Sequence, residues 1–513
     1  MVATTAVSLQ APLASARTAA IWWGALDFGE RRARLLAWKH AIAARSDELA
    51  VVISEETGKP VGDALLEIML AVEHLDWAAR NASRVLRRRR VRSGLLAADQ
   101  GAALAYRPLG VIAVIGPWNY PVYTPMGAIS YALAAGNAVI FKPSEHTPRT
   151  GHWLADAWES AVGEPVLQVV TGDGAVGAAL CAARVDKVAF TGSAATARKV
   201  MATCAQTLTP VVIEGGGKDA MIVAADADLD AAAKAAAFGG FGNAGQTCAG
   251  VERVYVERPV YQDFVNRLSA IASALRPSGA PAPASARAPA PRESASPDKS
   301  DSTSPDKSGL SGGSGSNGRR PGLPYGPMTV ASQVDIVRRH IDDALARGGM
   351  AVVGGPDAVR PPYIFPVVLT DVPEDSTAMT EETFGPTLVV NPVDNLDDAV
   401  RRANASSYGL AASIFSRNRR EAVRLASRQR TGAASVNGVL GFAAVPALPF
   451  GGVGDSGFGR IHGPDGLREF SRAQSVTWRR FKAPLDLMKL DRDQAVLDRA
   501  VKLFRLRHAR GAK

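Results

Sequence analysis

The sequence has few cysteines, and no two of them are spaced for a shared purpose. Its 513 residues contain three, Cys181, Cys204 and Cys248, which are odd in number and widely separated. They form neither a disulfide framework nor a CxxC metal pair, so we expect no metal site and predict a reducing compartment, the cytoplasm. The sequence also lacks any apolar run approaching the ~18–20 residues of a membrane-spanning helix. Its first residues lack a basic segment followed by an apolar one, so no secretory signal is expected.

Positive charge is present but is concentrated at one end of the chain. The formal net charge is +10, and residues 478–513 contain 11 Lys or Arg against 4 Asp. Because the remaining body is close to neutral, a surface that coats nucleic acid is excluded. The basic tail, residues 481–513, has Leu497, Val501 and Phe504 at helical spacing. It is interpreted either as a helix on an anionic membrane surface or, preferably, as a solvated or subunit-packed helix.

Length and composition indicate a globular protein of two or three domains. The hydrophobic fraction is 47% and the charged fraction is 21%, and 513 residues exceed what one core usually supports. Residues 29–92 have apolar positions at helical spacing, which predicts helices. Short apolar runs then alternate with alanine-rich stretches, and the runs lie at residues 111–115, 139–141, 167–170 and 187–190. This alternation predicts an α/β fold with a parallel sheet, whose ligands bind at the carboxyl ends of the strands.

A second αβ region follows Glu214 and contains an unusual insertion. Its predicted elements are helices at 231–237 and 333–347 and strands at 388–390 and 412–415. Residues from about 278 to 318 are mostly Pro, Ala, Ser, Gly, Asp and Lys, with almost no large apolar side chains. Such a segment cannot bury enough surface to fold, so a disordered surface insertion is predicted. A tolerated loop expansion is favoured over a phosphorylation or docking segment.

Cys248 and Glu214 are candidates for a nucleophile and its base. Cys248 ends the segment FGNAGQTC, and Glu214 precedes it by 34 residues at the start of EGGGK. A thiol among small residues with an available carboxylate suits attack on a carbonyl. Alone, Cys248 would be interpreted as a buried small hydrophobe and Glu214 as a carboxylate opening a glycine turn. Other segments of the chain favour the catalytic interpretation of both residues.

The ordered set of motifs resembles the NAD(P)-dependent aldehyde dehydrogenase superfamily. Besides the two segments around Cys248 and Glu214, the resemblance rests on GPWNYP, FKPSE, FTGS, EETFGP and LPFGGVGDSG, at residues 116–121, 141–145, 190–193, 381–386 and 448–457. The ending PFGGVG with His462-Gly463 is most similar to the class 3 branch, which acts on fatty and aromatic aldehydes. Succinate-semialdehyde-type relatives share parts of this ending.

The resemblance implies a reaction and three catalytic residues. Cys248 would attack the aldehyde to give a thiohemiacetal and then a thioester, Asn119 and the Cys248 backbone N–H would stabilise the oxyanion, and Glu214 would activate water. Alone, Asn119 would be a turn residue. Gly215 stands where the family commonly has leucine, and we expect it to leave Glu214 less well held. The expected substrate is a medium- or long-chain aliphatic or aromatic aldehyde, with succinate semialdehyde as the alternative.

The resemblance also implies cofactor contacts. Lys142 and Glu145 would hold the adenosine ribose, and because a carboxylate there repels a 2′-phosphate, NAD is expected, with NADP as an alternative. Gly192 and Ser193 would meet the pyrophosphate at a helix start, where Ser193 would also be an N-cap. Glu382 and Phe384 would contact the nicotinamide half.

The resemblance also implies a Rossmann-type NAD-binding domain at 1–86 and 109–213, a catalytic domain at 214–454, and an oligomerisation segment at 87–108 and 455–480. Within the last, Arg87 to Arg90 are interpreted as an exposed turn. A homodimer or homotetramer is expected. A coenzyme A-acylating enzyme and a catalytically silent member are weaker alternatives, because Glu214 and the full catalytic set are present.

Overall fold

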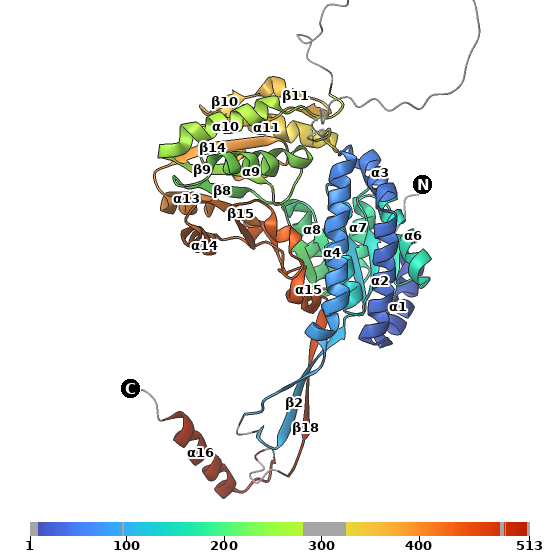
Figure 1. The fold of residues 1–513 in the computed structure, drawn as a ribbon. Helices are drawn as coiled ribbons and strands as arrows, with labels where there is room; N and C mark the ends of the chain where they lie inside the picture. The colour runs from blue at the N-terminus through green and yellow to red at the C-terminus, as the bar shows by residue number, and fades with distance from the viewer. Residues whose placement is uncertain (1–8, 95–96, 281–324, 483–486, 488, 510–513) are drawn as a thin grey trace, which may run out of the picture.

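The computed structural model describes residues 9–94, 97–280, 325–482, 487 and 489–509. Two α/β units, each built on its own sheet, lie side by side, and a narrow three-stranded sheet projects from them (Figure 1). Most of the predicted insertion, residues 281–318, lies outside the described residues, and so do parts of the basic tail. The predicted α/β class is confirmed.

Four helices open the chain and correspond to the predicted helical region. They are α1 (Gln10–Ala25), α2 (Phe28–Ala44), α3 (Ser46–Thr57) and α4 (Val61–Leu86). Asp27 and Glu30 form a capping box that starts α2, satisfying backbone N–H groups that the first turn leaves free. Gly58, with φ of 77°, ends α3 in the left-handed conformation. The prediction of helix up to residue 92 is wrong at its end, because Arg89–Val91 forms an exposed strand, β1.

The first sheet contains the four predicted parallel strands. Its order is β17-β7-β6-β3-β4-β5, and its strands are β3 (Val111–Ile115), β4 (Ala138–Lys142), β5 (Leu167–Val169), β6 (Lys187–Thr191), β7 (Val211–Glu214) and β17 (Gly457–Phe458). All neighbours are parallel except β17, which pairs antiparallel with β7. The intervening helices are α5 (Tyr123–Ala134), α6 (Pro148–Val162), α7 (Gly174–Ala182) and α8 (Ala194–Ala205).

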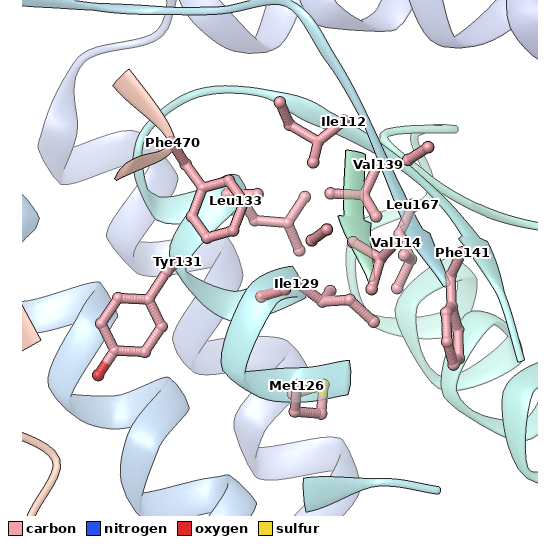
Figure 2. Close-up of a cluster of buried hydrophobic side chains, with 14 of the residues drawn as sticks. Ile112, Val114, Met126, Ile129, Tyr131, Leu133, Val139, Phe141, Leu167 and Phe470 are labelled. Atoms are coloured by element: carbon pink, nitrogen blue, oxygen red, sulfur yellow. The ribbon is translucent and has the colours of Figure 1, made fainter. Parts of the chain in front are cut away.

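Helix α5 packs its apolar side chains on this sheet. Met126, Ile129 and Leu133 face strand residues that include Val114 and Val139, and all are buried (Figure 2). The central strands β3 and β4 are buried along their whole length, as expected for a parallel sheet covered on both faces. This core holds the carboxyl ends of β4, β6 and β7 along one edge, where Lys142, Thr191 and Glu214 lie.

The second sheet has the order β10-β13-β14-β9-β8-β15-β16. Its strands are β8 (Asp219–Val223), β9 (Val251–Glu257), β10 (Met350–Val353), β13 (Val367–Thr370), β14 (Thr387–Val393), β15 (Ala411–Phe415) and β16 (Ala433–Val436). Its helices are α9 (Leu229–Phe241), α10 (Tyr261–Ala274), α11 (Ala331–Ala346), α12 (Thr377–Thr380), α13 (Leu396–Ala403) and α14 (Arg419–Ser427). The short elements are η3 (Gly242–Gly245), η4 (Arg258–Val260), η6 (Pro356–Ala358), β11 (Val359–Arg360), β12 (Tyr363–Ile364), η7 (Gly441–Ala444) and η8 (Gly454–Ser456). The predicted elements at 231–237, 333–347, 388–390 and 412–415 therefore fall on α9, α11, β14 and β15.

The projecting sheet joins β1, β2 (Gln100–Pro108) and β18 (Ser471–Arg479) in antiparallel order. Arg89 and Arg90 are exposed but lie in β1, so the interpretation of Arg87 to Arg90 as a turn is wrong for these two. Within residues 455–480, β17 belongs to the first sheet and α15 (Gly463–Glu469) contacts α4. The division into domains stays a prediction.

The last helix, α16 (Gln494–His508), follows this projecting sheet and lies away from both α/β units (Figure 1). Among the described residues, no helix combines the length and apolar character needed to cross a bilayer.

A buried ion pair links the opening helices to the start of α5. Lys59 Nζ donates to Glu67 Oε2 at 2.9 Å and to the Asn119 carbonyl oxygen at 2.6 Å. Glu67 Oε1 accepts from the backbone N–H groups of Val122 and Tyr123. Both charged side chains are almost fully buried, at 2% and 0% exposed.

Replacement of Glu67 by alanine should therefore leave the buried ammonium of Lys59 without a carboxylate partner. We expect the variant to lose about 3–5 kcal/mol of stability, because an uncompensated buried charge is costly. Glu73→Ala, on the exposed face of α4, is the matched control and should stay within about 0.5 kcal/mol. The urea midpoints of the two variants measure the difference, and equal midpoints would contradict this role for the ion pair.

Candidate active site

Cys248 lies in a tightly constrained loop between α9 and β9. Asn243 and Ala244 both have positive φ, 53° and 56°, a strained conformation for residues with side chains. A Cβ atom on Gly245 would lie 2.2 Å from the backbone of Gly385, so only glycine fits there. The Gln246 side chain donates to the Asn243 carbonyl oxygen and accepts from the Thr329 N–H. The loop therefore holds the partly buried thiol in one place.

Glu214 meets this thiol from the other sheet. It is the last residue of β7, and the Cys248 Sγ donates to its Oε1 at 3.1 Å. Thr191, at the end of β6, donates its hydroxyl to the second carboxylate oxygen at 3.3 Å. The pair predicted from the sequence is thus brought together between the two α/β units.

Burial sets the resting protonation of this pair. It raises the pKa of the Cys248 thiol well above its ordinary value, and the charge of Glu214 raises that pKa further. Burial also raises the pKa of the Glu214 carboxyl. Because the thiol donates to the carboxylate, the resting nucleophile is protonated and its proton acceptor is already in hydrogen-bond contact.

The Asn119 side chain lies beside the same loop. Its Nδ2 donates to the Gln246 carbonyl oxygen at 2.9 Å, two residues before Cys248. The backbone carbonyl oxygen of Asn119 accepts from Lys59 Nζ and from Asn243 Nδ2. An amide nitrogen has two hydrogens, so Asn119 can donate to an additional oxygen near Cys248 without giving up this contact.

Four predicted cofactor residues lie where two strands of the first sheet end. Lys142 is the last residue of β4 and Glu145 follows it, while Gly192 and Ser193 follow β6. Lys142 is buried and its Nζ donates to the Pro143 carbonyl oxygen at 3.0 Å, with Glu145 at 3.9 Å. Burial lowers the pKa of Lys142. An ammonium has three hydrogens, so this group can donate further to ligand hydroxyls. Ser193 caps α8 by accepting from the Thr196 N–H, as its N-cap interpretation predicted.

Glu382 and Phe384 lie across the glycine segment that follows Glu214. Glu382 Oε1 accepts from the Gly217 N–H at 3.0 Å, and a Cβ atom on Gly216 would lie 2.0 Å from that oxygen. Burial raises the pKa of Glu382 to about 8, and the charge of Glu252 acts in the same direction. Phe384 has a φ of 50°. Its ring packs edge to face against the Trp118 ring, with 5.5 Å between the two ring centroids.

Gly215 does not loosen Glu214 as the sequence led us to expect. Its N–H donates to the Ser456 carbonyl oxygen at 3.0 Å, and a Cβ atom there would lie 2.5 Å from the Asp455 carbonyl oxygen. The turn before β17 therefore fills the space that a side chain would need. Sequence reasoning assigned no role to Thr191 or Gln246, although both lie within the motifs FTGS and FGNAGQTC. It missed the Lys59–Glu67 pair, because no local pattern marks these two residues.

The fold and site together define an α/β protein with a buried thiol–carboxylate pair between two largely parallel sheets. The aldehyde dehydrogenase family model matches residues 2–296 and 312–476. The chain therefore belongs to the aldehyde dehydrogenase family, whose members are oxidoreductases that act on aldehydes and use NAD or NADP.

Individual relatives cover nearly the whole chain. The chain is 38% identical over 479 residues to 4,4'-diapolycopene aldehyde oxidase from Methylomonas sp, covering 93% of this chain and 82% of that protein. It is 33% identical over 480 residues to a protein of Mycolicibacterium smegmatis provisionally named succinate-semialdehyde dehydrogenase (NADP+), covering 92% and 84%. The crystal structure of an NAD-dependent aldehyde dehydrogenase from Sinorhizobium meliloti superposes with a TM-score of 0.81 at 30% identity, covering 94% and 89%.

The raised pKa of Cys248 predicts a steep alkaline dependence of its alkylation. In cofactor-free protein, the rate with iodoacetamide should rise about tenfold per pH unit from pH 7, because only the thiolate reacts. Glu214→Gln removes the adjacent negative charge, so its rate profile should move to lower pH. Cys248→Ala reports any labelling of the buried Cys181 and Cys204. A flat profile, or one that Glu214→Gln leaves in place, would contradict the proposed electrostatics.

Proposed function

We propose that this protein oxidises an aldehyde to the carboxylic acid, with Cys248 as nucleophile, Asn119 as oxyanion donor and Glu214 as base. The observation that carries the proposal is the 3.1 Å hydrogen bond from the Cys248 thiol to Glu214. The overall change is aldehyde plus water plus NAD(P)+ to carboxylic acid, NAD(P)H and a proton. The nicotinamide, when bound, supplies the acceptor for the hydride.

The residues of this chain account for the remaining steps. Glu214 takes the thiol proton as the sulfur attacks the carbonyl carbon, and the Asn119 amide with the Cys248 backbone N–H stabilises the oxyanion. Loss of hydride leaves a thioester on Cys248. Glu214 releases the thiol proton to solvent and then takes a proton from water, which attacks the thioester and releases the acid. That second proton passes from Glu214 to the departing thiolate, which restores the Cys248 thiol.

The residues at the sheet edge fit a dinucleotide. Lys142 retains donors for ribose hydroxyls, and the start of α8 at Ser193 offers backbone N–H groups to a pyrophosphate. Glu382 would accept from the second ribose, and Phe384 would line the nicotinamide. Glu145, 3.9 Å from Lys142, supports NAD over NADP because its carboxylate would repel a 2′-phosphate. NADP stays the alternative cofactor, because the name of the Mycolicibacterium smegmatis relative includes NADP+.

The proposed substrate is an apolar aldehyde, medium- or long-chain aliphatic or aromatic, as in the class 3 branch. Tyr120 and Tyr123 are half-buried near Cys248, and desolvation raises the pKa of both phenols, so both rings are uncharged. Among the described residues, the cation in contact with Asn119 is Lys59, which Glu67 already neutralises. A carboxylate-bearing substrate would therefore lack a free cation among these contacts. Succinate semialdehyde stays the alternative because of the second relative.

Turnover tests this function directly. Absorbance at 340 nm should rise with NAD and decanal or benzaldehyde, and more slowly with succinate semialdehyde, because the groups around Cys248 are apolar or already paired. Cys248→Ala should lower kcat/KM by at least about 10³-fold, since it removes the nucleophile. Turnover only after addition of coenzyme A would indicate an acylating enzyme. Cofactor binding without turnover would indicate a silent member, and either result would contradict the proposal.

We also propose that the enzyme works as a homodimer or homotetramer in the cytoplasm. For α16, the alternative to the solvated or subunit-packed helix preferred from the sequence is binding to anionic lipid, and the exposed side chains of this helix support that alternative. Leu503, Phe504 and Leu506 are 45%, 53% and 56% exposed, and Arg499 and Lys502 lie beside Leu503 and Leu506 on the same side of the helix. An apolar face beside basic residues suits an anionic bilayer surface. Cys181 and Cys204 are buried free thiols that lie close to each other. Neighbouring free thiols are consistent with a reducing compartment.

Co-sedimentation with lipid vesicles tests the helix. Vesicles of phosphatidylcholine with phosphatidylserine should retain the protein. High salt should release it, since each basic residue near the surface contributes about 1 kcal/mol that salt screens. Phe504→Asp should also release it, because it places a charge on the apolar side chains that would enter the bilayer surface. Met350→Asp, at an equally exposed apolar residue of β10, is the control and should still bind. Equal recovery with vesicles of phosphatidylcholine alone, or no recovery with either, would contradict the lipid proposal.

A further inference from the structure

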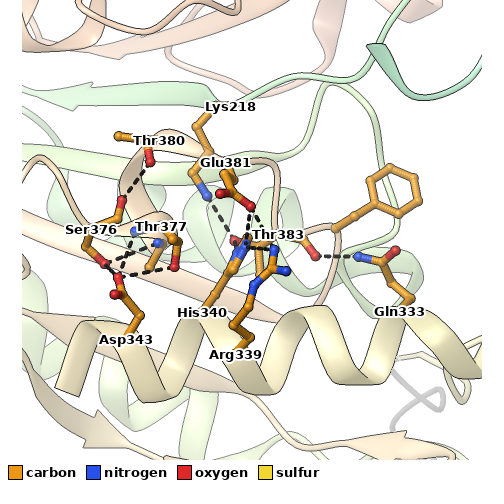
Figure 3. A network of polar contacts seen from close by, with 12 residues as sticks. Lys218, Gln333, Arg339, His340, Asp343, Ser376, Thr377, Thr380, Glu381 and Thr383 are labelled. Atoms are coloured by element: carbon orange, nitrogen blue, oxygen red, sulfur yellow. Dashed lines mark hydrogen bonds and ion pairs between the residues drawn. The ribbon is translucent and has the colours of Figure 1, made fainter. Parts of the chain in front are cut away.

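A buried polar network connects helix α11 to the segment that carries Glu382 and Phe384, the two residues proposed to contact the nicotinamide half of the cofactor. Figure 3 shows Lys218, His340, Glu381 and Thr383 meeting above this helix. His340 is fully buried, whereas the Glu381 side chain is about half exposed, at 52%. The network therefore runs from a buried lysine next to the Glu214 glycine segment to the protein surface.

The donors and acceptors in the network assign a direction to each hydrogen bond. Lys218 Nζ donates to Glu252 and, at 2.9 Å, to Thr383 Oγ1. Because an ammonium only donates, the Thr383 hydroxyl hydrogen is left for His340 Nδ1, 3.1 Å away. With the proton of the neutral imidazole on Nε2, this nitrogen lies 3.4 Å from Glu381 Oε2 and 3.3 Å from Arg339 Nη2, which itself donates to Glu381 Oε2.

His340 remains neutral despite its charged neighbours. Burial lowers the pKa of the imidazole, and the positive charge of Lys218 lowers it further. Glu252 and Glu381 act in the opposite direction. A neutral ring keeps Nδ1 as an acceptor, which the Thr383 hydroxyl requires.

These contacts surround Glu382 without touching its carboxylate. In an extended segment successive side chains point to opposite sides, so Glu381 and Thr383 face α11 while Glu382 faces Gly216 and Gly217. Gln333, also on α11, donates to the Thr383 carbonyl oxygen at 2.8 Å.

Glu252 holds the backbone of the same segment from the opposite side. Its carboxylate accepts from the backbone N–H groups of Thr383 and Phe384. The strained positive φ of Phe384 is thus fixed by several independent hydrogen bonds.

We infer that His340 is a positioning residue for the nicotinamide half of the cofactor site, acting through Thr383 on Glu382 and Phe384. The inference rests on the proposed function, which gives Glu382 and Phe384 their cofactor contacts. Loss of the Nδ1 acceptor would leave the hydrogen of the buried Thr383 hydroxyl without an acceptor and loosen the turn that carries the Phe384 ring.

Two substitutions separate the contacts of the imidazole. His340→Asn places an oxygen near the position of Nδ1, so it keeps an acceptor for Thr383 and loses Glu381. His340→Gln reaches the position of Nε2, so it keeps a donor for Glu381 and loses Thr383. Asp343→Asn is the control on the same helix, because Asp343 contacts Ser376 and Thr377 instead.

The experiment measures the dissociation constant of NAD, and of NADP, by tryptophan fluorescence, since Trp118 contacts Phe384. His340→Gln should weaken binding about tenfold, the usual cost of an unpaired buried hydroxyl. His340→Asn should stay within about threefold and Asp343→Asn should match the unaltered protein. The thermal midpoints of the two His340 variants should fall alike, so stability would not explain their difference in binding.

Equal binding by His340→Asn and His340→Gln would overturn the inference, and so would equal weakening by Asp343→Asn. Binding that follows the expected order, in a protein that oxidises no aldehyde, would support the positioning role and contradict the proposed function alone. Absence of NAD and NADP binding in the unaltered protein would contradict both.

Discussion

The hydrogen bond between the Cys248 thiol and Glu214 is the contact on which the site depends, because its two partners come from different sheets. Glu214 ends a strand of the first sheet, and Cys248 lies in the loop that enters the second. Any shift of one α/β unit against the other would separate them. The burial that raises both pKa values also makes the contact strong, since charge on either group is poorly solvated there.

Close backbone packing keeps the two halves in register around this contact. Gly215, Gly216 and Gly245 each face a neighbour that leaves no room for a Cβ atom. The carboxylate of Glu382 occupies the space above Gly216, while the turn at Asp455 and Ser456 closes over Gly215. Glycine here allows close approach of separate chain segments, and the neighbouring hydrogen bonds prevent the flexibility that glycine would otherwise bring.

Much of this could be predicted from the sequence, where the signal was local. The buried strands at 111–115 and 187–190 are short, largely apolar runs followed by polar or glycine residues, and parallel pairing brings their carboxyl ends together. Strand β1 could not be predicted, because an exposed arginine-rich strand shows no apolar alternation. The two-residue strand β17 and the contact from His340 to Thr383 depend on partners far along the chain. Long-range hydrogen bonds of this kind leave no periodic pattern in the sequence.

The central claim, a covalent acyl group on Cys248 that Glu214 helps to hydrolyse, is tested most directly by trapping that group. Glu214→Gln is incubated with NAD and decanal, quenched in acid, digested and examined by mass spectrometry, beside Cys248→Ala. The account predicts a decanoyl thioester on the peptide that contains Cys248, persisting in Glu214→Gln and absent from Cys248→Ala. A decanoyl group on another residue, or none in a preparation whose unaltered form turns over decanal, would contradict it.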